Sequence, residues 1–144
     1  ASKDIAQACD KMQGQITSGT CSIAQRAGIV ACEGGLESVL KMKEAFLKRR
    51  DLVYGLLRAI PGIKTNLPSG AFYFFPDVSS YFGKSANGEK IKDALDLSLY
   101  LLNEAHVALV SGDAFGDPNS IRISYAASQD QIKEAIIRIK KVVS

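Results

Sequence analysis

The stretch Ser111–Ala127, SGDAFGDPNSIRISYAA, decides the fold of the second half of the chain. Its first half is a turn-rich loop, in which glycine, aspartate, proline and asparagine supply turn residues. Its second half alternates as a half-buried strand requires, with three apolar side chains on one side: Ile121, Ile123 and Tyr125. Arg122 stands on the other side, where a guanidinium is suited to bidentate binding of a carboxylate or phosphate. The alternative is an exposed strand arginine that only keeps the sheet soluble.

The composition is that of an ordinary globular domain. The 144 residues are 47% hydrophobic and 23% charged, with a net charge of +3, which is average for such domains. This charge is too small and too dispersed to indicate nucleic-acid binding. No apolar run approaches about 18 residues, so we expect no membrane-spanning segment. The N-terminus lacks the pattern of a secretory signal, and we expect a cytoplasmic protein.

The cysteines and the histidine indicate no metal site. Cys9, Cys21 and Cys32 cannot all pair within one chain, no Cys-x-x-Cys occurs, and His106 is the only histidine. A zinc site or a Cys–His nucleophile is therefore not expected. Free, buried thiols in a reducing cytoplasm are the simplest interpretation. His106 precedes an expected strand, and we assign it a structural role.

Two helices and a loop are predicted before residue 35. Apolar residues at three- and four-residue spacing predict a short helix over 1–13, and the polar stretch 13–20 is typical of a loop. Ser18 or Thr20 is placed to cap a second helix. That helix is expected to end at Gly34-Gly35.

A longer helix follows over residues 36–60. Its apolar residues fall on one broad stripe, and the breaker pair Pro61-Gly62 ends it. About 25 residues at about 1.5 Å each span the width of a small domain. A helix of that length usually joins two bodies.

From residue 63 the pattern becomes that of strands and helices in the order β-β-α-β-β-α. Strands are expected over four ranges: 63–67, 71–75 (a buried aromatic strand), 107–110 and 121–125. The helix after residue 90 has Asp93 or an upstream residue as its cap and carries an apolar stripe of Ile91, Leu95, Leu99 and Leu102. The last has a capping box of Ser128 with Gln131. This order predicts an α+β fold with helices on one face of the sheet, which by itself specifies no function.

The segment Val107–Ala127 resembles the C-terminal signature of class I pyridoxal-phosphate-dependent aminotransferases, the aspartate aminotransferase group. In that signature a strand leads into Pro-Gly, then an Ala-Phe-Gly loop, then Arg-(Ile/Leu)-Ser-(Tyr/Phe)-Ala. Ser111 stands where the family commonly has proline. The matching motifs are Ala114-Phe115-Gly116, Arg122-Ile123-Ser124-Tyr125-Ala126 and, in family order upstream, Gln13-Gly14-Gln15-x-Thr17-Ser18, Phe46-x-x-Arg49-Arg50-Asp51 and Pro68-x-Gly70-Ala71-Phe72-Tyr73.

This resemblance implies the C-terminal small domain of the fold-type I transferase fold, a small β-sheet with helices packed on one face, preceded by a long interdomain helix. The implied boundaries are 1–35 for the end of the large, cofactor-binding domain, 36–62 for the interdomain helix and 63–144 for the small domain. The chain would be the C-terminal fragment of an aminotransferase, with aspartate aminotransferase as the expected parent. Such an enzyme transfers an amino group between an amino acid and a 2-oxo acid.

Four site residues follow from the resemblance. Arg122 would bind the α-carboxylate of the substrate, and Phe72 would line the substrate pocket, with plain core packing as the alternative for Phe72. Thr17 and Ser18 fall in a loop that in the family approaches the active site of the partner subunit. A homodimer is therefore implied for the full-length enzyme, and an ordinary helix N-cap is the alternative for Ser18.

The reactive half of such an enzyme is not expected in this chain. In the family the Schiff-base lysine and the phosphate cradle lie upstream, and Lys3 lacks the Gly-x-Arg that should follow that lysine. We therefore assign no catalytic, cofactor-binding or metal-binding residue. Pyridoxal 5'-phosphate is expected in the full-length enzyme, whose N-terminal remainder is the implied partner of this chain, and not on this fragment, which we expect to be inactive alone. The alternatives are another fold-type I enzyme, such as a carbon–sulfur lyase or a cyclopropane-forming (ACC) synthase, and a non-enzymatic α+β module that binds carboxylates.

Overall fold

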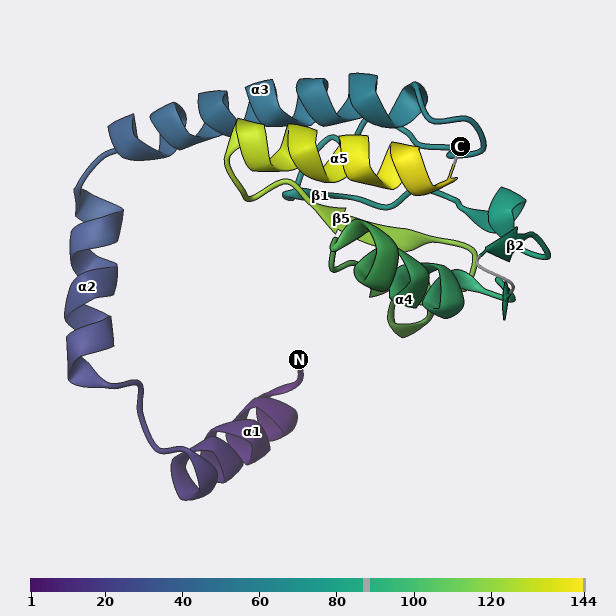
Figure 1. Ribbon diagram of the computed structural model, residues 1–144. Coiled ribbons are helices and arrows are strands. Elements are labelled where there is room, and N and C mark those ends of the chain that lie inside the picture. The colour runs from purple at the N-terminus through teal and green to yellow at the C-terminus, as the bar shows by residue number, and fades with distance from the viewer. Residues whose placement is uncertain (87–88, 144) are drawn as a thin grey trace. The chain divides into compact units, whose positions relative to one another are not determined.

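The computed structural model describes residues 1–86 and 89–143. The chain forms two compact units, Ala1–Leu40 and Lys41–Ser144, which we call the first and second units. Three helices come first along the chain (Figure 1): α1 (Lys3–Ile16), α2 (Ser22–Glu33) and α3 (Glu37–Arg58). The expected long helix is thus confirmed as α3, and the boundary between the two units falls within it.

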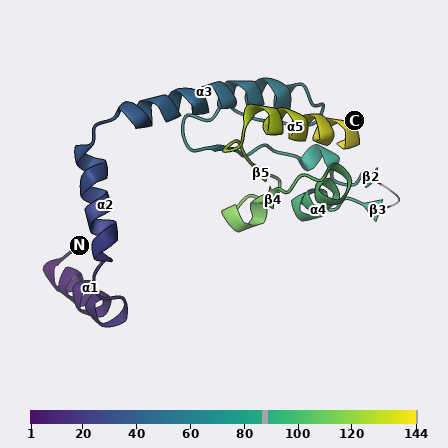
Figure 2. The same cartoon turned by 60° about the vertical axis from the view of Figure 1, so that its left-hand side comes forward.

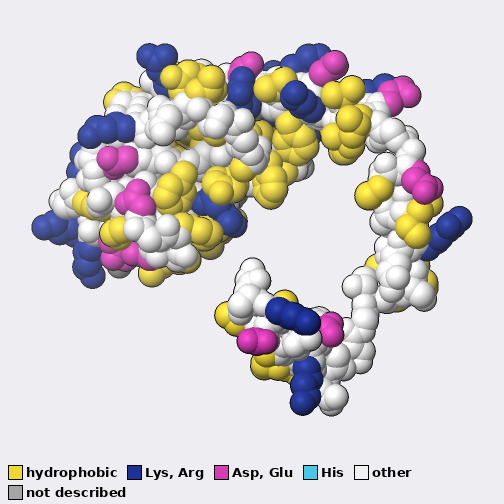
Figure 3. Space-filling view, turned by 180° about the vertical axis from the view of Figure 1, so that it is seen from behind, with side chains coloured by type: hydrophobic (Ala, Val, Ile, Leu, Met, Phe, Trp, Pro, Cys, Tyr) yellow, Lys and Arg dark blue, Asp and Glu magenta, His cyan; other side chains and the backbone are white. Residues whose placement is uncertain are grey.

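The first unit has no buried residue. Its helices carry apolar side chains on their surface, as Figure 3 shows in yellow. The three thiols are free and exposed, so the prediction of buried thiols is wrong for this chain. The physical reason is that two short helices without a packing partner have no interior in which to place a side chain.

The ends of the first two helices differ in part from the prediction. α1 continues to Ile16, because the backbone ladder persists until Thr17 N donates to Gln13 O at 3.0 Å. Cys21 is the N-cap residue of α2 and makes no side-chain cap bond, so the prediction of a Ser18 or Thr20 cap is wrong. Ser18 has a left-handed backbone with φ 58°, whereas an N-cap residue is typically extended.

The second unit is built on a three-stranded antiparallel sheet in the order β1-β5-β4. Its strands are β1 (Tyr73–Phe74), β4 (Val110–Ser111) and β5 (Ile121–Ser124). The register pairs Phe74 with Ile123 and Val110 with Arg122. A separate two-stranded hairpin joins β2 (Ser85–Ala86) to β3 (Glu89–Lys90). β5 is therefore the central strand, and both of its neighbours position side chains beside Arg122.

One face of this sheet carries the core. α3, α4 (Ala94–Ala105) and α5 (Gln129–Val143) pack there, and α3 and α5 lie side by side in both views (Figures 1 and 2). Side chains of the three helices and of the sheet form one buried cluster, which includes Val53, Leu57, Ile60, Phe74, Leu97, Leu101, Ile121, Ile123, Tyr125, Ile132, Ile136 and Ile139. The expected arrangement of helices on one face of a small sheet is confirmed.

α4 buries a different stripe from the predicted one. The buried residues of the helix include Leu97, Leu101 and Ala105. Of the predicted stripe, Ile91 precedes the helix and is buried, while the three residues within the helix are about half exposed: Leu95 52%, Leu99 49% and Leu102 45%. Both sets recur at helical spacing, so the sequence pattern could not choose between them. The exposed set lines a groove of about 390 Å³ beside β4. The Asp93 cap is confirmed, because its carboxylate accepts from Asp96 N at 2.8 Å.

The strands are shorter than predicted. The expected strand 63–67 is reduced to an isolated bridge between Lys64 and Asp77. In the aromatic run 71–75 only Phe74 is buried, so the prediction of a buried aromatic strand is wrong. A sheet covered by helices on one face buries only alternate residues of a strand.

The helix ends in the second unit follow local rules. His106 has a left-handed backbone and is the C-cap residue of α4. The predicted capping box at the start of α5 is confirmed, since Gln131 N donates to Ser128 Oγ at 3.2 Å and Ser128 N donates to Gln131 Oε1 at 3.3 Å. Within the described residues, no helix is long and apolar enough to cross a membrane.

Candidate functional site

Arg122 lies on the face of the sheet opposite the core. Its neighbours in β5, Ile121 and Ile123, are 1% and 7% exposed, whereas Arg122 is half-buried and Ser124 is exposed. The alternation predicted for this strand is confirmed. Because β5 is the central strand, the guanidinium rises from the middle of the sheet and not from its edge.

Two aromatic rings flank this guanidinium. The Cζ atom of Arg122 lies 4.7 Å from the ring centroid of Phe115 and 5.7 Å from that of Tyr73. Contacts of this kind are attractive, because the negative face of the ring meets a cation that is weakly hydrated. The guanidinium thus contacts two aromatic rings, and no hydrogen-bond acceptor for its N–H groups is found among the described residues.

No acidic partner neutralises Arg122 within the described part of the chain. Arg50 and Arg138 are each paired with a carboxylate at 2.8 Å, on Asp51 and Glu134 respectively. For Arg122, by contrast, the described residues supply ring faces and no carboxylate. A half-buried, unpaired guanidinium on an open sheet face is suited to accept an anionic ligand in a bidentate contact.

The loop that carries Phe115 is held tightly against β5. It is a 3-10 turn, Gly112–Phe115, and Gly112 N donates to Ser120 O at 2.7 Å. A Cβ on Gly112 would lie 2.1 Å from Asp117 O and 2.4 Å from Ser120 O, so only glycine fits there. The close approach fixes the position of the turn relative to the strand that carries Arg122.

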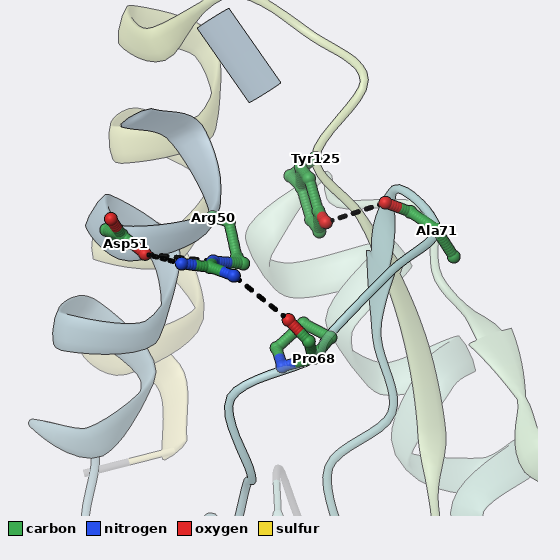
Figure 4. Close-up of polar contacts among 5 residues, drawn as sticks. All are labelled: Arg50, Asp51, Pro68, Ala71 and Tyr125. Atoms are coloured by element: carbon green, nitrogen blue, oxygen red, sulfur yellow. Dashed lines mark hydrogen bonds and ion pairs between the residues drawn. The ribbon is translucent and has the colours of Figure 1, made fainter. Parts of the chain in front are cut away.

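The turn before β1 is anchored to α3 and to the end of β5 (Figure 4). Arg50 pairs with Asp51 at 2.8 Å and donates to Pro68 O at 3.3 Å. The hydroxyl of Tyr125 donates to Ala71 O at 2.8 Å. Burial raises the pKa of the Tyr125 phenol, and the charge of Arg50 offsets part of that rise. These contacts fix the start of β1, where Phe72 and Tyr73 project.

Phe72 lies one ring away from Arg122. Its side chain is 53% exposed, and its ring meets that of Tyr73 edge to face with centroids 6.0 Å apart. Tyr73, in turn, contacts the guanidinium. The structure therefore brings Phe72 near Arg122 only through Tyr73.

Thr17 and Ser18 belong to the first unit, whereas Arg122 and Phe72 belong to the second. Thr17 is the C-cap residue of α1, and its hydroxyl donates to Gln13 O at 3.4 Å while the Gln13 amide donates back to it. Ser18 is exposed. Both side chains are thus available on the surface of the first unit.

The sequence analysis assigned no role to Tyr73 or Phe115, the two residues that contact Arg122. Each is visible in the sequence only as part of a family motif, Phe115 in Ala114-Phe115-Gly116 and Tyr73 in Pro68-x-Gly70-Ala71-Phe72-Tyr73. The signal for Tyr73 is strand register, since Tyr73 pairs with Ser124, two residues along β5 from Arg122. Register cannot be read from one sequence. In the described part of the chain, no group of His, Cys, Asp and Glu residues could hold a metal ion.

The chain is similar to known proteins over nearly its whole length. Residues 1–139 match the family model of class I and II aminotransferases. The chain is 46% identical, over 98% of its length, to a bifunctional aspartate aminotransferase and glutamate/aspartate-prephenate aminotransferase of Petunia hybrida, of which it covers 30%. It is 44% identical to an aspartate aminotransferase of Pinus pinaster, with 96% of the chain and 29% of that protein covered.

A solved structure shows the same fold. The crystal structure of the aspartate aminotransferase from Rhizobium meliloti matches 97% of this chain with a TM-score of 0.90 and 41% identity, and 35% of that protein is covered. An aspartate aminotransferase from Thermotoga maritima matches 98% of the chain with a TM-score of 0.80 and 33% identity, with 33% of that protein covered. The chain thus spans about a third of the length of these relatives. It belongs to the class I and II aminotransferase family.

Proposed function

We propose that the full-length protein containing this chain is a pyridoxal-phosphate-dependent aminotransferase that moves an amino group between an amino acid and a 2-oxo acid, with aspartate as the expected amino donor. This chain supplies the arginine that binds the α-carboxylate of the substrate. The observation that carries the proposal is the guanidinium of Arg122, which contacts two rings on the face of the sheet opposite the core and has no acidic partner among residues 1–86 and 89–143. It occurs in a chain that is 46% identical to an aspartate aminotransferase.

Arg122 has the chemistry for this role. A guanidinium is charged at every physiological pH and offers parallel N–H donors that match the two oxygens of a carboxylate. Fixing one end of the amino acid removes its rotational freedom before the reaction, which lowers the barrier by orientation. Closure of residues 63–144, as a small domain, over the substrate would exclude water from the site.

The residues around Arg122 do not fit a covalent attachment of the cofactor. The side chains around Arg122 are the rings of Tyr73 and Phe115 and, by strand register and alternation, Val110 and Ser124. None of these carries an amine that could bind the cofactor aldehyde. We propose that the group that binds pyridoxal phosphate covalently belongs to the remainder of the protein.

The remaining assignments are part of the same proposal. Phe72, through Tyr73, forms an apolar wall beside the carboxylate site, and Thr17 and Ser18 reach the site of a second subunit in a homodimer. The proposed division is a large-domain segment over 1–35, an interdomain helix over 36–62 and a small domain over 63–144. We place the enzyme in the cytoplasm.

The test is an Arg122→Lys substitution in the full-length protein. An ammonium cannot reproduce the bidentate contact, so we expect kcat/KM for aspartate and 2-oxoglutarate to fall about 100-fold. The matched control is Arg138→Lys, which alters an arginine paired with Glu134 on the surface of α5 and should leave the kinetics unchanged. Wild-type kinetics in Arg122→Lys would remove Arg122 from the site.

The products of the same assay separate the other functions. An aminotransferase forms glutamate only when 2-oxoglutarate is present, whereas a lyase or a cyclopropane-forming synthase releases its product without an amino acceptor. If the protein were a non-enzymatic module, the 144-residue chain alone would bind carboxylates. We expect this isolated chain to show neither amino transfer nor cofactor absorbance.

A further inference from the structure

The orientation of Arg122 needs a physical cause. An arginine side chain has several rotatable bonds and loses considerable rotamer freedom when it is fixed. Arg50 is fixed by the Asp51 carboxylate and by Pro68 O. Arg122 has no such acceptor among the described residues, and its recorded contacts are ring faces. Among the described residues, the contacts with these two rings are therefore what restrains its guanidinium.

Phe115 is the nearer of the two rings. Its centroid lies 4.7 Å from Arg122 Cζ, against 5.7 Å for Tyr73. The ring of Phe75 meets Phe115 edge to face, with centroids 6.0 Å apart. The backbone on either side of Phe115 is also constrained, because Gly112 is buried under the loop and Gly116 has φ 83°.

We propose that Phe115 is a positioning residue, which holds the guanidinium of Arg122 flat with its N–H edge directed at the substrate carboxylate. The inference rests on the carboxylate-binding role proposed above for Arg122. Phe115 is 49% exposed, so burial alone does not account for the placement of an apolar ring there. The contact of this ring with the Arg122 guanidinium accounts for its placement, because a cation over a ring face is attractive even at a partly exposed site. Without the ring, the Arg122 side chain would sample other rotamers, and the substrate carboxylate would bind only the fraction of molecules that has the correct one.

The first measurement uses the unmodified full-length protein with labelled arginine. A side-chain N–H held over the face of a benzene ring resonates upfield of the same group in free arginine. We expect the Nε–H signal of Arg122, identified by its loss in Arg122→Lys, to be shifted upfield in both the cofactor-free and the cofactor-loaded protein. A signal at the free-arginine position would overturn the proposal, and this outcome does not depend on any Phe115 variant folding.

The second measurement is binding of succinate, a carboxylate that the enzyme cannot transaminate. Phe115→Leu keeps an apolar side chain but removes the ring, and we expect the succinate Kd to rise about fivefold or more. The KM for aspartate should rise by a larger factor than kcat falls, because binding of the carboxylate is weakened equally in the ground state and in the transition state. Phe115→Tyr keeps the ring and should restore both the affinity and the upfield signal. As a matched control, Phe82→Leu removes a ring that packs against the core and should leave Kd unchanged.

A double substitution separates this inference from the proposed function. If Phe115 acts through Arg122, Phe115→Leu should add little to the loss of succinate affinity already caused by Arg122→Lys. Equal losses in Phe115→Leu and Phe115→Tyr, or fully additive losses in the double variant, would overturn the positioning role. Unchanged succinate binding in Arg122→Lys would instead overturn the role of Arg122 itself.

Discussion

The first and second units contain helices of comparable length but differ completely in burial. α1 and α2 bury no side chain, although they carry large apolar residues that are about half exposed or more, including Ile5 58%, Met12 62%, Ile16 73%, Ile23 79% and Val30 58%. The second unit buries a continuous cluster that joins three helices to the sheet. Helix formation is thus encoded locally in both units, whereas burial requires a partner surface that only the second unit has.

This contrast agrees with the length of the chain. It spans 30% of the Petunia hybrida relative and 35% of the Rhizobium meliloti structure. We expect the apolar faces of the first unit to pack against parts of the full-length protein that lie outside these 144 residues. In the isolated chain, substitutions in the two units should therefore have very different consequences.

The largest difference should come from truncating matched apolar residues. Leu57 is fully buried and Ile23 is 79% exposed. We expect Leu57→Ala to lower the free energy of unfolding by about 3 kcal/mol, because it leaves a cavity, and Ile23→Ala to change it by less than about 0.5 kcal/mol. Urea unfolding of the 144-residue chain, followed by circular dichroism, measures both. A cost for Ile23→Ala close to that for Leu57→Ala would show that the first unit has a core of its own.

Replacing a glycine by alanine should destabilise the second unit but stabilise a helix of the first unit. In the second unit, a Cβ on Gly112 would lie 2.1 Å from Asp117 O, and backbone atoms cannot easily move away. We expect Gly112→Ala to destabilise by about 2 kcal/mol or more. In α2 a Cβ on Gly28 would meet nothing within 4 Å, and Gly28→Ala should favour the helix by about 1 kcal/mol. Unfolding midpoints together with helicity test the pair, and a stable Gly112→Ala protein would argue against the close approach of this loop.

Removing helix N-cap side chains should give a smaller difference in stability between the units. Ser128 caps α5 through its contact with Gln131 N at 3.2 Å, whereas Ser2 at the start of α1 makes no side-chain cap bond. Ser128→Ala is expected to cost about 1 kcal/mol and Ser2→Ala only a few tenths. The same urea series measures both variants. Equal costs would mean that α1 acquires a cap in solution.

The smallest effects should come from the two shifted pKa values, which are raised at Tyr125 in the second unit and lowered at Cys21 in the first. Burial raises the pKa of Tyr125, so its stabilising contribution is complete below the unfolded value of about 10 and is lost as the pH rises through the folded pKa. At the start of α2, the nearby backbone N–H groups of Ile23 and Ala24 lower the pKa of the Cys21 thiol, although the thiol makes no side-chain cap bond of good geometry. Tyrosine absorbance at alkaline pH reports only the second unit, because no tyrosine precedes residue 54.

Two variants test these titrations. Tyr125→Phe should remove a late-ionising phenol and make stability above about pH 10 less dependent on pH. Cys21→Ser should remove a thiol that reacts with iodoacetamide below the pH range of an ordinary cysteine. Because burial also raises the pKa of Tyr81, Tyr125→Phe should remove only part of the late absorbance change, and an undiminished change would exclude Tyr125 as its source. An unchanged alkylation profile in Cys21→Ser would show that Cys21 is not the activated thiol.

Much of the fold was predictable, because its signals are local. The caps at Asp93 and Ser128 depend on contacts three residues along the chain, and both were predicted. The alternation that separates Arg122 from Ile121 and Ile123 depends only on the period of a strand. The burial of α4 was predicted on the wrong stripe, because two apolar stripes of the helix compete and only the neighbouring strand decides between them.

By itself the sequence determined that a guanidinium stands opposite the apolar side of a strand, and its motifs indicated the family to which the chain belongs. Tertiary structure alone decided what surrounds that guanidinium. Tyr73 comes from β1, Phe115 comes from the loop after β4, and they meet Arg122 because strands distant in sequence pair in one register. Pairing of that kind depends on how apolar surface is buried across the whole unit, which no local pattern specifies.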